Sequence, residues 1–509
     1  MATRNPAAAP VFWPGVVACF LGVAYTLGIT VHYPLSVSPD GVSYLELATH
    51  LMEGLGPRTI DETGSLQVVT HWPPLYPLCL AGLSFVLGVE PLVAARILAA
   101  LCLGTSMLFL DRILVRFDPS AAVRCLCLSL LFTSLPFVIY TRAISEGLFI
   151  TLLLALTLCL VRFQESGRRG ALVLAGVIGG LMFLSRYAAV GFLAGAALFL
   201  ITRSAPFGKR LEHLAMVFVP ALLVGSTWLA YTLTEGTNPS NRTLAFHFVS
   251  YNHLVILAKT VLSWLSPAMP YSGFVVLALL AGLGAMLARM RPNLALRDLP
   301  AAFPLLAWLS ATYILFLVFS VTFVDYHTQF NYRILAPVFP FVVFMSLPFW
   351  QWAFTTLSAR RLATGILVLI GISYLWAFTV RSEDTFRNGH YYTSGAWLNS
   401  PTLVHLGSIP TEQRVYTNGP DPIRLWQGYR PAVVRLPIRV EVTSQTANTD
   451  FERQMQNLHE QLRAGEAVVI YFDAIYRPYL PNAAILKARF ADIPVREFGD
   501  GFAMGRGTP

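Results

Sequence analysis

Long apolar runs separated by short polar segments dominate the chain. Most of these runs approach the roughly 20 residues that a helix needs to cross a bilayer, so we predict a polytopic α-helical membrane protein with about eleven transmembrane helices. The predicted spans are 11–31, 92–111, 122–141, 144–161, 170–185, 188–202, 213–233, 271–289, 302–324, 334–354 and 362–380. The first run lacks a long basic region before it and a small-residue cleavage site after it, so we expect a retained helix rather than a signal peptide.

Arginine and lysine residues gather in five loops, and these loops orient the predicted helices. Cytoplasmic loops of membrane proteins carry an excess of such residues, so an even number of crossings must separate one basic loop from the next. The loops contain Arg112, Arg116 and Arg124; Arg162, Arg168 and Arg169; Arg203, Lys209 and Arg210; Arg289, Arg291 and Arg297; and Arg360 and Arg361. This parity predicts a cytoplasmic N-terminus and an outer location for residues 381–509.

The segment 170–202 is too long to be a single span. As one helix it would measure roughly 50 Å, against a hydrocarbon core of about 30 Å, and both of its ends are basic. We predict two short spans that meet near the sequence LSRYAA, with Arg186 at the turn. The run 74–89 starts at a Pro-Pro pair, and a crossing there would break the parity of the basic loops. We therefore expect a helix that lies along or partly inside the outer interface.

Residues 381–509 differ from the rest of the chain, because they are polar and rich in Pro, Asn and Arg. The segments RVYTN (414–418) and EAVVIYF (466–472) have the pattern of strands. The segment DFERQMQNLHEQLRAG (450–465) has the pattern of an amphipathic helix that ends at Gly465. These elements predict a small α/β domain on the outer face.

Composition supports the membrane assignment. The 509 residues are 55% hydrophobic and only 12% charged, whereas soluble globular proteins carry about 25% charged residues. The formal net charge of +9 falls mainly in the short loops, which favours membrane topology over nucleic-acid binding. The six cysteines all lie in apolar stretches, so the sequence indicates neither a disulfide framework nor a cysteine metal site.

Ionisable and aromatic polar residues gather at the predicted outer ends of the helices. Polar groups at membrane depth are costly unless they are paired or face water, so they mark candidate sites. Asp40 and Tyr44 in the first outer loop are four residues apart and share one helical face. The other candidates are Glu46 and His71 in the same loop, Glu146 at the start of the fourth span, Arg186 in the short hairpin, and Tyr332 and Arg333 at the start of the tenth span.

The first-loop residues also have structural interpretations. Asp40 follows Pro39 and can simply cap a helix N-terminus. Glu46 lies away from the Asp40 face and suits a solvated or paired position. His71 and the neighbouring Trp72 suit interfacial anchors. These alternatives stay open at the level of the sequence.

The same holds for the candidates at the helix ends. Glu146 can cap its helix or pair with Arg142. Arg333 can snorkel, with its aliphatic part on apolar surface and its guanidinium group at the membrane interface. Arg186 is harder to explain in structural terms. The short hairpin places it below the headgroups, where an arginine needs an anionic ligand or a partner such as Glu146.

Taken in order along the chain, these features resemble a known family. They are Asp40 with Tyr44 after the first span, HWPPLYP at 71–77, SE at 145–146, Arg186 in a short hairpin, and YRILAPVFP at 332–340. Over residues 10–380 the chain resembles polyprenyl-phosphate-dependent membrane glycosyltransferases of the GT-C fold. The nearest types are bacterial relatives of protein O-mannosyltransferases and of the aminoarabinose transferase that modifies lipid A. The resemblance implies a catalytic transmembrane domain over 1–380, with a first outer loop at 32–90. The periplasmic α/β domain that we predict over 381–509 resembles the appended outer domains of such enzymes only in position.

The resemblance also implies an activity. The chain is expected to be a bacterial inner-membrane enzyme that moves a sugar, with inversion, from a polyprenyl-phosphate donor to a hydroxyl group of an acceptor protein, lipid or glycan. Asp40 would be the general base, because a phosphate leaving group departs without a protonating acid. Arg186 and Arg333 would bind the lipid phosphate, with assistance from His71. The residues expected to orient the sugar or the cations are Tyr44, Tyr332 and Glu146.

The chain departs from the family pattern in the first loop. Gly41 follows Asp40 where many members carry a second acid, and His71-Trp72 precede Pro-Pro where some members carry a lysine. No cofactor or metal site is indicated, although a divalent metal ion stays open. The main rival function is a secondary transporter or lipid flippase, and a non-catalytic assembly protein is a third. Transporters usually show internal repeats and midplane sites, whereas here no repeat is visible and the ionisable residues lie toward one face.

Overall fold

The chain folds into two compact units. The computed structural model describes residues 12–60, 66–235, 246–267, 281–283, 299–326, 328–355, 357–410, 412–428, 433–440 and 446–506. Unit 1 comprises Met1–His32 and Thr70–Arg387, and unit 2 comprises Tyr33–Val69 and Asn388–Pro509. Each unit has a hydrophobic core of its own.

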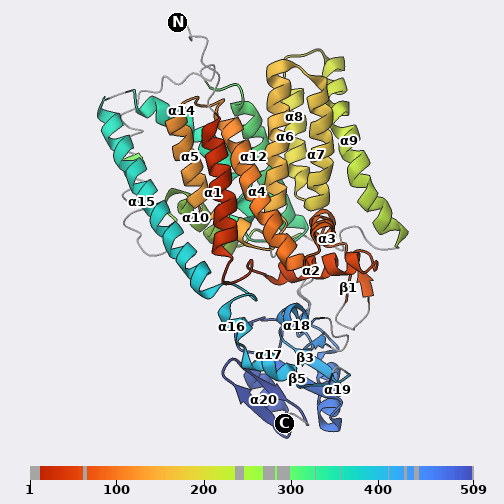
Figure 1. Ribbon diagram of the computed structural model, residues 1–509. Helices are drawn as coiled ribbons and strands as arrows, with labels where there is room; N and C mark the ends of the chain where they lie inside the picture. Colours follow the sequence, from red (N-terminus) through yellow and green to blue (C-terminus); the bar gives the residue numbers. More distant parts are fainter. Residues whose placement is uncertain are drawn as a thin grey trace. The chain divides into compact units, whose positions relative to one another are not determined.

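Unit 1 is helical, and Figure 1 shows its longer helices running side by side. Its elements are α1 (Trp13–Ile29), α3 (Leu75–Leu87), α4 (Pro91–Leu114), α5 (Ala121–Thr133), the 3-10 helix η1 (Pro136–Thr141), α6 (Glu146–Ser166), α7 (Arg169–Ser185), α8 (Ala189–Ile201), α9 (Phe207–Thr234), α10 (Tyr251–Leu265), α12 (Phe303–Phe323), α13 (Tyr332–Leu335), α14 (Phe339–Ala353) and α15 (Leu357–Asn388). Among the described helices, α4, α6, α9, α12 and most of α15 are long and apolar enough to cross a membrane. Helices α1, α3, α5, α7 and α8 are apolar but shorter.

Ten of the eleven predicted spans coincide in position with described helices. The remaining span, 271–289, and the fourth basic loop lie outside the described residues except for 281–283. Two predicted spans are interrupted. Span 122–141 ends as an α-helix at Thr133 and continues as η1, and span 334–354 divides into α13 and α14. A proline lies at each interruption, Pro136 and Pro337, and proline cannot donate the backbone hydrogen bond that would continue the helix.

Glycines hold the short hairpin close to its neighbours. The predicted pair of helices is confirmed, since α7 and α8 are joined by the turn 186–188. A Cβ added at Gly176 of α7 would overlap the backbone oxygen of Val217 in α9, and one at Gly195 of α8 would lie 2.6 Å from Oγ1 of Thr312 in α12. Small residues at helix contacts allow backbones to approach this closely. The packing against α9 and α12 therefore fixes the turn that carries Arg186.

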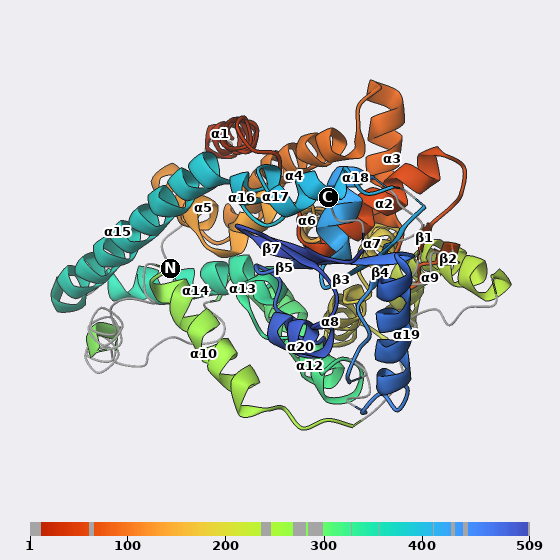
Figure 2. The same ribbon diagram turned by 90° about the horizontal axis from the view of Figure 1, so that it is seen from below.

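Unit 2 is built around a sheet with helices on both faces (Figure 2). Within the described residues the sheet has the strand order β4-β3-β5-β7-β6. Strands β4, β3 and β5 are parallel to one another, and β7 runs antiparallel to both of its neighbours, β5 and β6. The elements are α2 (Pro39–Met52), β1 (Arg58–Ile60), β2 (Leu66–Val68), α16 (Gly395–Leu398), α17 (Pro401–Leu406), β3 (Arg414–Thr417), α18 (Pro420–Gln427), β4 (Val433–Arg435), α19 (Phe451–Ala464), β5 (Ala467–Phe472), α20 (Ala483–Arg489), β6 (Val495–Phe498) and β7 (Gly501–Met504). The predicted strands correspond to β3 and β5, and α19 ends at Gly465 (φ 77°) as its sequence indicates.

The segment predicted as the first outer loop is divided between the two compact units. Residues 33–69 belong to unit 2 and residues 70–90 to unit 1. Val37 pairs in parallel with Tyr391, and the hydroxyl of Thr393 accepts from the N–H of Val37 at 3.3 Å and donates to the carbonyl of Leu35 at 2.9 Å. These contacts join residues more than 350 positions apart, so a change of composition along the chain does not reveal them.

Arg124 is buried and does not belong to a basic surface loop. Its Nε and Nη2 donate to the two carboxylate oxygens of Asp111 at 2.7 and 2.8 Å, and the side chains are 1% and 2% exposed. A buried bidentate pair of this kind neutralises its own charge. The remaining cations of the first basic loop are Arg112 and Arg116, and Arg116 pairs with Glu165 of α6.

Candidate active site

Glu146 is the buried centre of a charged cluster in unit 1. It is the first residue of α6, and its side chain is 2% exposed. Its Oε1 accepts a hydrogen bond from Nε of Arg333 and lies 2.7 Å from Nη1 of Arg186. Two cations compensate the cost of burying this carboxylate, and the positive end of the α6 dipole favours it further.

Arg186 reaches Glu146 from the turn of the short hairpin. It directly follows α7 with an extended backbone (φ −154°, ψ 133°), and its N–H donates to the carbonyl of Met182 at 2.8 Å. Its Nη1 also donates to the hydroxyl of Ser145 at 3.3 Å. The side chain is 21% exposed. Glu146 is thus the partner that the position of Arg186 in a short hairpin requires.

The four-residue helix α13 brings two further side chains to the cluster. Asn331 begins it, and its Oδ1 accepts from two backbone N–H groups of the helix, each at 3.1 Å. Arg333 turns back to Glu146 and is 24% exposed, so it does not merely extend to the interface. The hydroxyl of Tyr332 accepts a hydrogen bond from Nη2 of Arg142 at 2.6 Å. Arg142, the partner considered for Glu146, therefore binds the residue next to Arg333.

The segment that carries His71 lies beside the same hairpin turn. The His71 ring is exposed and meets the Trp72 ring edge-on, with ring centres 4.8 Å apart. The carbonyl of Thr70 accepts from the hydroxyl of Tyr187 at 2.8 Å, and an indole N–H of α9 donates to that hydroxyl at 3.0 Å. Because Tyr187 follows Arg186 in the chain, the backbone just before His71 is fixed next to the charged cluster.

The cluster brings guanidinium groups together around one buried carboxylate. Arg186 and Arg333 pair with Glu146, and Arg142 donates to the neighbouring Tyr332. Guanidinium groups keep their charge in proteins and bind phosphate through two parallel hydrogen bonds. Within the described part of the chain, no group of three or more His, Cys, Asp or Glu side chains could hold a metal ion. The arrangement suits an anion of the size and charge of a phosphate.

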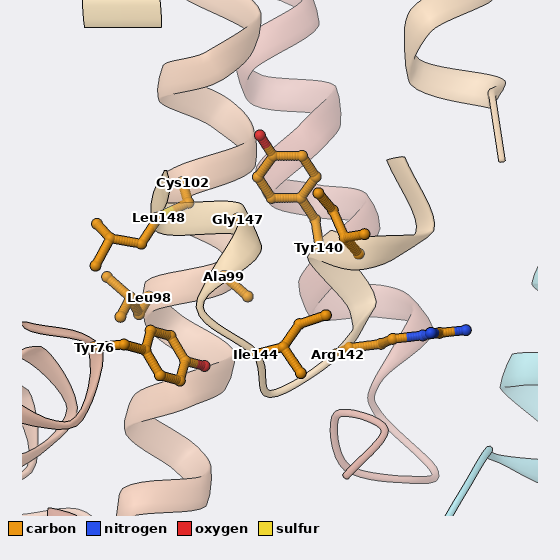
Figure 3. Close-up of a pocket in the computed structure, with 10 residues that line it drawn as sticks. Tyr76, Leu98, Ala99, Cys102, Tyr140, Arg142, Ile144, Gly147 and Leu148 are labelled. Atoms are coloured by element: carbon orange, nitrogen blue, oxygen red, sulfur yellow. The ribbon is translucent and has the colours of Figure 1, made fainter. Parts of the chain in front are cut away.

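A small cavity borders Arg142 (Figure 3). It is lined by Tyr76, Tyr140 and Arg142 among others and has a volume of about 10 Å³, which is about enough for one water molecule. Figure 3 shows that the Arg142 side chain points away from Tyr76 and out of this space. The cavity is therefore a small gap in the packing, and the guanidinium of Arg142 faces away from it.

The remaining predicted residues lie on α2 in unit 2. Ser38 occupies the N-cap position with an extended backbone and Pro39 is the first helical residue, so Asp40 lies in the first turn and is not the N-cap. Proline suits that first position, because the N–H it lacks would have no helical partner. Tyr44 is buried, with 1% of its surface exposed. Glu46 pairs with Arg424 of α18 at 3.7 Å.

Two residues at the cluster were not among the candidate site residues: Arg142, which the sequence offered only as a structural partner of Glu146, and Tyr187. Each adjoins a predicted residue, since Arg142 precedes the Ser-Glu pair by three positions and Tyr187 follows Arg186. Their position next to predicted site residues is the one feature of the sequence that points to them. Their partners, however, lie 190 and 117 positions away in the chain, so only the folded structure identifies them.

The architecture matches a solved structure over almost the whole of both chains. The structure of ArnT from Cupriavidus metallidurans bound to undecaprenyl phosphate has a TM-score of 0.60 at 11% identity and covers 97% of this chain and 98% of that one. The apo state of ArnT has a TM-score of 0.59 at 13% identity and covers 96% and 97%. This chain has the GT-C fold. The predicted fold class, including a small C-terminal α/β region, is confirmed.

A sequence-family match supports the same assignment. Residues 71–231 match the family described as dolichyl-phosphate-mannose-protein mannosyltransferase. The matched segment contains His71, Glu146 and Arg186. A search of curated proteins finds no significant match. The resemblance to the GT-C fold is thus confirmed over the whole chain, and residues 71–231 carry the sequence signature of the matched family.

Proposed function

We propose that this chain transfers a sugar from a polyprenyl-phosphate donor to a hydroxyl-bearing acceptor, with inversion at the anomeric carbon. The observation that supports it is the buried Glu146 that holds Arg186 and Arg333 side by side. The ArnT structure with the same fold is described as bound to undecaprenyl phosphate, a lipid of this class. The family resemblance leads us to propose a bacterial inner-membrane enzyme. The parity of the basic loops supports a cytoplasmic N-terminus and an outer, periplasmic unit 2.

Arg186 and Arg333 are suited to bind the donor phosphate. Glu146 fixes one edge of each guanidinium, while 21% and 24% of the two side chains remain exposed. Groups held in place in this way need little reorganisation when charge develops on a substrate. The phosphate gains negative charge as its bond to the sugar breaks, so its attraction to the arginines increases along the reaction. His71, exposed beside the same turn, is proposed to donate a further hydrogen bond to it.

In the proposed reaction, the acceptor oxygen attacks the anomeric carbon from the face opposite the phosphate. The bond between the anomeric carbon and the phosphate oxygen breaks, and polyprenyl phosphate leaves with the electron pair. Asp40 takes the proton of the acceptor hydroxyl, and no acid is needed for the leaving group. This role for Asp40 is argued from its place in the sequence and from the chemistry. Tyr44 and Tyr332 are proposed to orient the sugar.

A transfer assay on the purified full-length protein tests this function. A panel of polyprenyl-phosphate sugars, with and without EDTA, should yield free polyprenyl phosphate and modified acceptor from at least one donor. A transporter or flippase would move the lipid without breaking its bond to the sugar. Release of polyprenyl phosphate from none of the donors would contradict the proposal.

The Asp40→Asn variant tests the proposed base. We expect turnover to fall by about 10²- to 10⁴-fold, the usual contribution of a general base, while the melting temperature stays at the wild-type value. Asp473→Asn is the matched control, because it removes the same charge from an exposed position of the same unit. Near-normal turnover of Asp40→Asn would show that another group accepts the proton.

A further inference from the structure

A buried histidine joins α10 to the connector, residues 324–331, that runs from α12 to α13. His253 is the third residue of α10 and is 4% exposed. Its Nε2 lies 2.9 Å from the carbonyl oxygen of Tyr326 in the connector. Because a carbonyl oxygen only accepts, Nε2 carries the proton and donates this hydrogen bond. The bond joins residues 73 positions apart and ties α10 to the chain that leads into α13.

The other ring nitrogen of His253 is used within α10. Ser250 is the N-cap of this helix, and its backbone N–H donates to Nδ1 of His253 at 3.2 Å. The hydroxyl of Ser250 accepts from the backbone N–H of His253 at 3.4 Å, which completes a capping box. The capping box accounts for Nδ1 but not for the bond from Nε2 to Tyr326. The two ring nitrogens therefore have separable roles.

The His253 ring also packs against two residues of the connector. It meets the Tyr326 ring at 74° with ring centres 5.1 Å apart, and its centre lies 6.0 Å from that of the Phe330 ring. Phe330 is 4% exposed. The next residue, Asn331, is the N-cap of α13. The histidine thus holds the connector immediately before the helix that carries Arg333.

The position of Arg333 depends on contacts of this kind, because α13 is very short. It has four residues, whereas isolated helices of fewer than about 12–15 residues are marginal in water. Tyr313 of α12 holds its C-terminal half, since the Tyr313 hydroxyl donates to the carbonyl of Ile334 at 2.8 Å. Its N-terminal end directly follows Phe330. A displacement of the connector would therefore move Arg333 relative to Glu146, its partner in α6.

We infer that His253 is a positioning residue that keeps Arg333 in place for the donor phosphate. The inference rests on the proposed function and adds to it a residue that acts through another side chain. His253 fixes the connector, the connector fixes α13, and α13 presents Arg333 beside Glu146. A misplacement of about 1 Å caused by a distant substitution can reduce a rate by about 10²-fold. His253 therefore affects the donor and not the acceptor.

Two substitutions separate the roles of the ring nitrogens. His253→Asn keeps an acceptor near the position of Nδ1 for the cap, but it lacks the donor to Tyr326. His253→Gln is longer and can place an amide N–H near the position of Nε2. We expect His253→Asn to raise the Kd for undecaprenyl phosphate and the donor KM about tenfold, because the connector loses a buried hydrogen bond. The acceptor KM should stay at the wild-type value, and His253→Gln should recover most of the lost donor affinity.

His213→Asn is the matched control. His213 lies on α9, where its ring meets that of Phe163 with ring centres 4.8 Å apart. The same substitution there should leave the Kd for undecaprenyl phosphate unchanged. Melting temperatures in one detergent report whether each variant is folded.

A double-mutant cycle distinguishes positioning from a general loss of stability. In an Arg333→Gln background, His253→Asn should cause no further loss of donor affinity, because the side chain that it positions is absent. Additive losses in the double mutant would overturn the inference, and so would equal donor affinities for His253→Asn and His213→Asn. Failure of the wild type to bind undecaprenyl phosphate and to release it from any donor would overturn the proposed function instead.

Discussion

The charged cluster predicts a large effect for a substitution that changes almost no volume. Glu146→Gln keeps the shape of the side chain and one oxygen as an acceptor, but it removes the negative charge that Arg186 and Arg333 share. Because Glu146 is 2% exposed and the arginines are 21% and 24% exposed, water can solvate the remaining charges only in part. The two cations then repel each other across a neutral amide.

The size of the effect follows from the burial of the group. Loss of one partner from a buried ion pair costs about 3–5 kcal/mol. The glutamine oxygen recovers about 1 kcal/mol as a neutral acceptor, and the exposed parts of the arginines reduce the loss further. We expect the free energy of unfolding to fall by about 2–3 kcal/mol and the melting temperature to fall by several degrees.

A matched control lies on the same helix. Glu165, near the end of α6, pairs with Arg116 at 3.0 Å, with side-chain exposures of 48% and 27%. An exposed pair contributes about 0–1 kcal/mol, so Glu165→Gln should barely change the melting temperature. Thermal melts followed by tryptophan fluorescence, in one detergent, compare the two variants with the wild type.

Added polyprenyl phosphate extends the test. Its phosphate supplies negative charge beside Arg186 and Arg333, so it should restore part of the melting temperature lost in Glu146→Gln. Transfer should nevertheless fall at least tenfold, because the arginines are no longer held in place. Equal melting temperatures for Glu146→Gln and Glu165→Gln would refute the reasoning, since they would show that the buried carboxylate is not needed to neutralise the cluster.

Two further predictions concern packing and pH. Gly176→Val introduces a side chain where even a Cβ overlaps a backbone oxygen of α9, so the yield of folded protein should fall sharply. In the control, Gly170→Ala, no atom lies within 4 Å of the added carbon, and the yield should match that of the wild type. Hydrogen bonds from Arg463 and then His459 lower the pKa of Asp492 from 3.8 to about 2. A carboxyl with a lowered pKa stabilises the fold above about pH 4 and loses that contribution as the pH falls toward 2. Melting temperatures of Asp492→Asn should therefore lack this part of the acid dependence, and an unchanged acid slope would contradict the assignment.

Most helices follow from local properties of the sequence. The predicted span 302–324 is α12 (Phe303–Phe323), and the predicted span 92–111 lies within α4 (Pro91–Leu114). In lipid a backbone must satisfy its own hydrogen bonds, so a long apolar run has few alternatives to a helix. The division of 170–202 into two helices follows from length in the same way. The sequence analysis treats 122–141 and 334–354 as continuous spans, although Pro136 and Pro337 mark the breaks at η1 and before α14.

The candidate site is only partly visible in the sequence. The depth of Arg186 in a short hairpin implies a partner, and Glu146 was among the residues available to it. Arg333 was a candidate from the family resemblance, but its contact with Glu146 could not be deduced, because the two residues lie 187 positions apart and an arginine at a helix end has an adequate solvated position of its own. The bond between Arg142 and Tyr332 depends on the same long-range contact.

By itself the sequence determined the apolar, membrane type of the chain, the order of the helices, the short hairpin and the chemical types available at the helix ends. These are properties of length, apolarity and spacing, which act over about 20 residues. The tertiary structure decided which charges meet: Arg186 and Arg333 share Glu146, and Arg124 is buried against Asp111. It also joined residues 33–69 to the C-terminal sheet unit and placed His253 of α10 against the connector before α13. Ion pairing and packing depend on distances in space between residues far apart in the chain, and no local pattern encodes those distances.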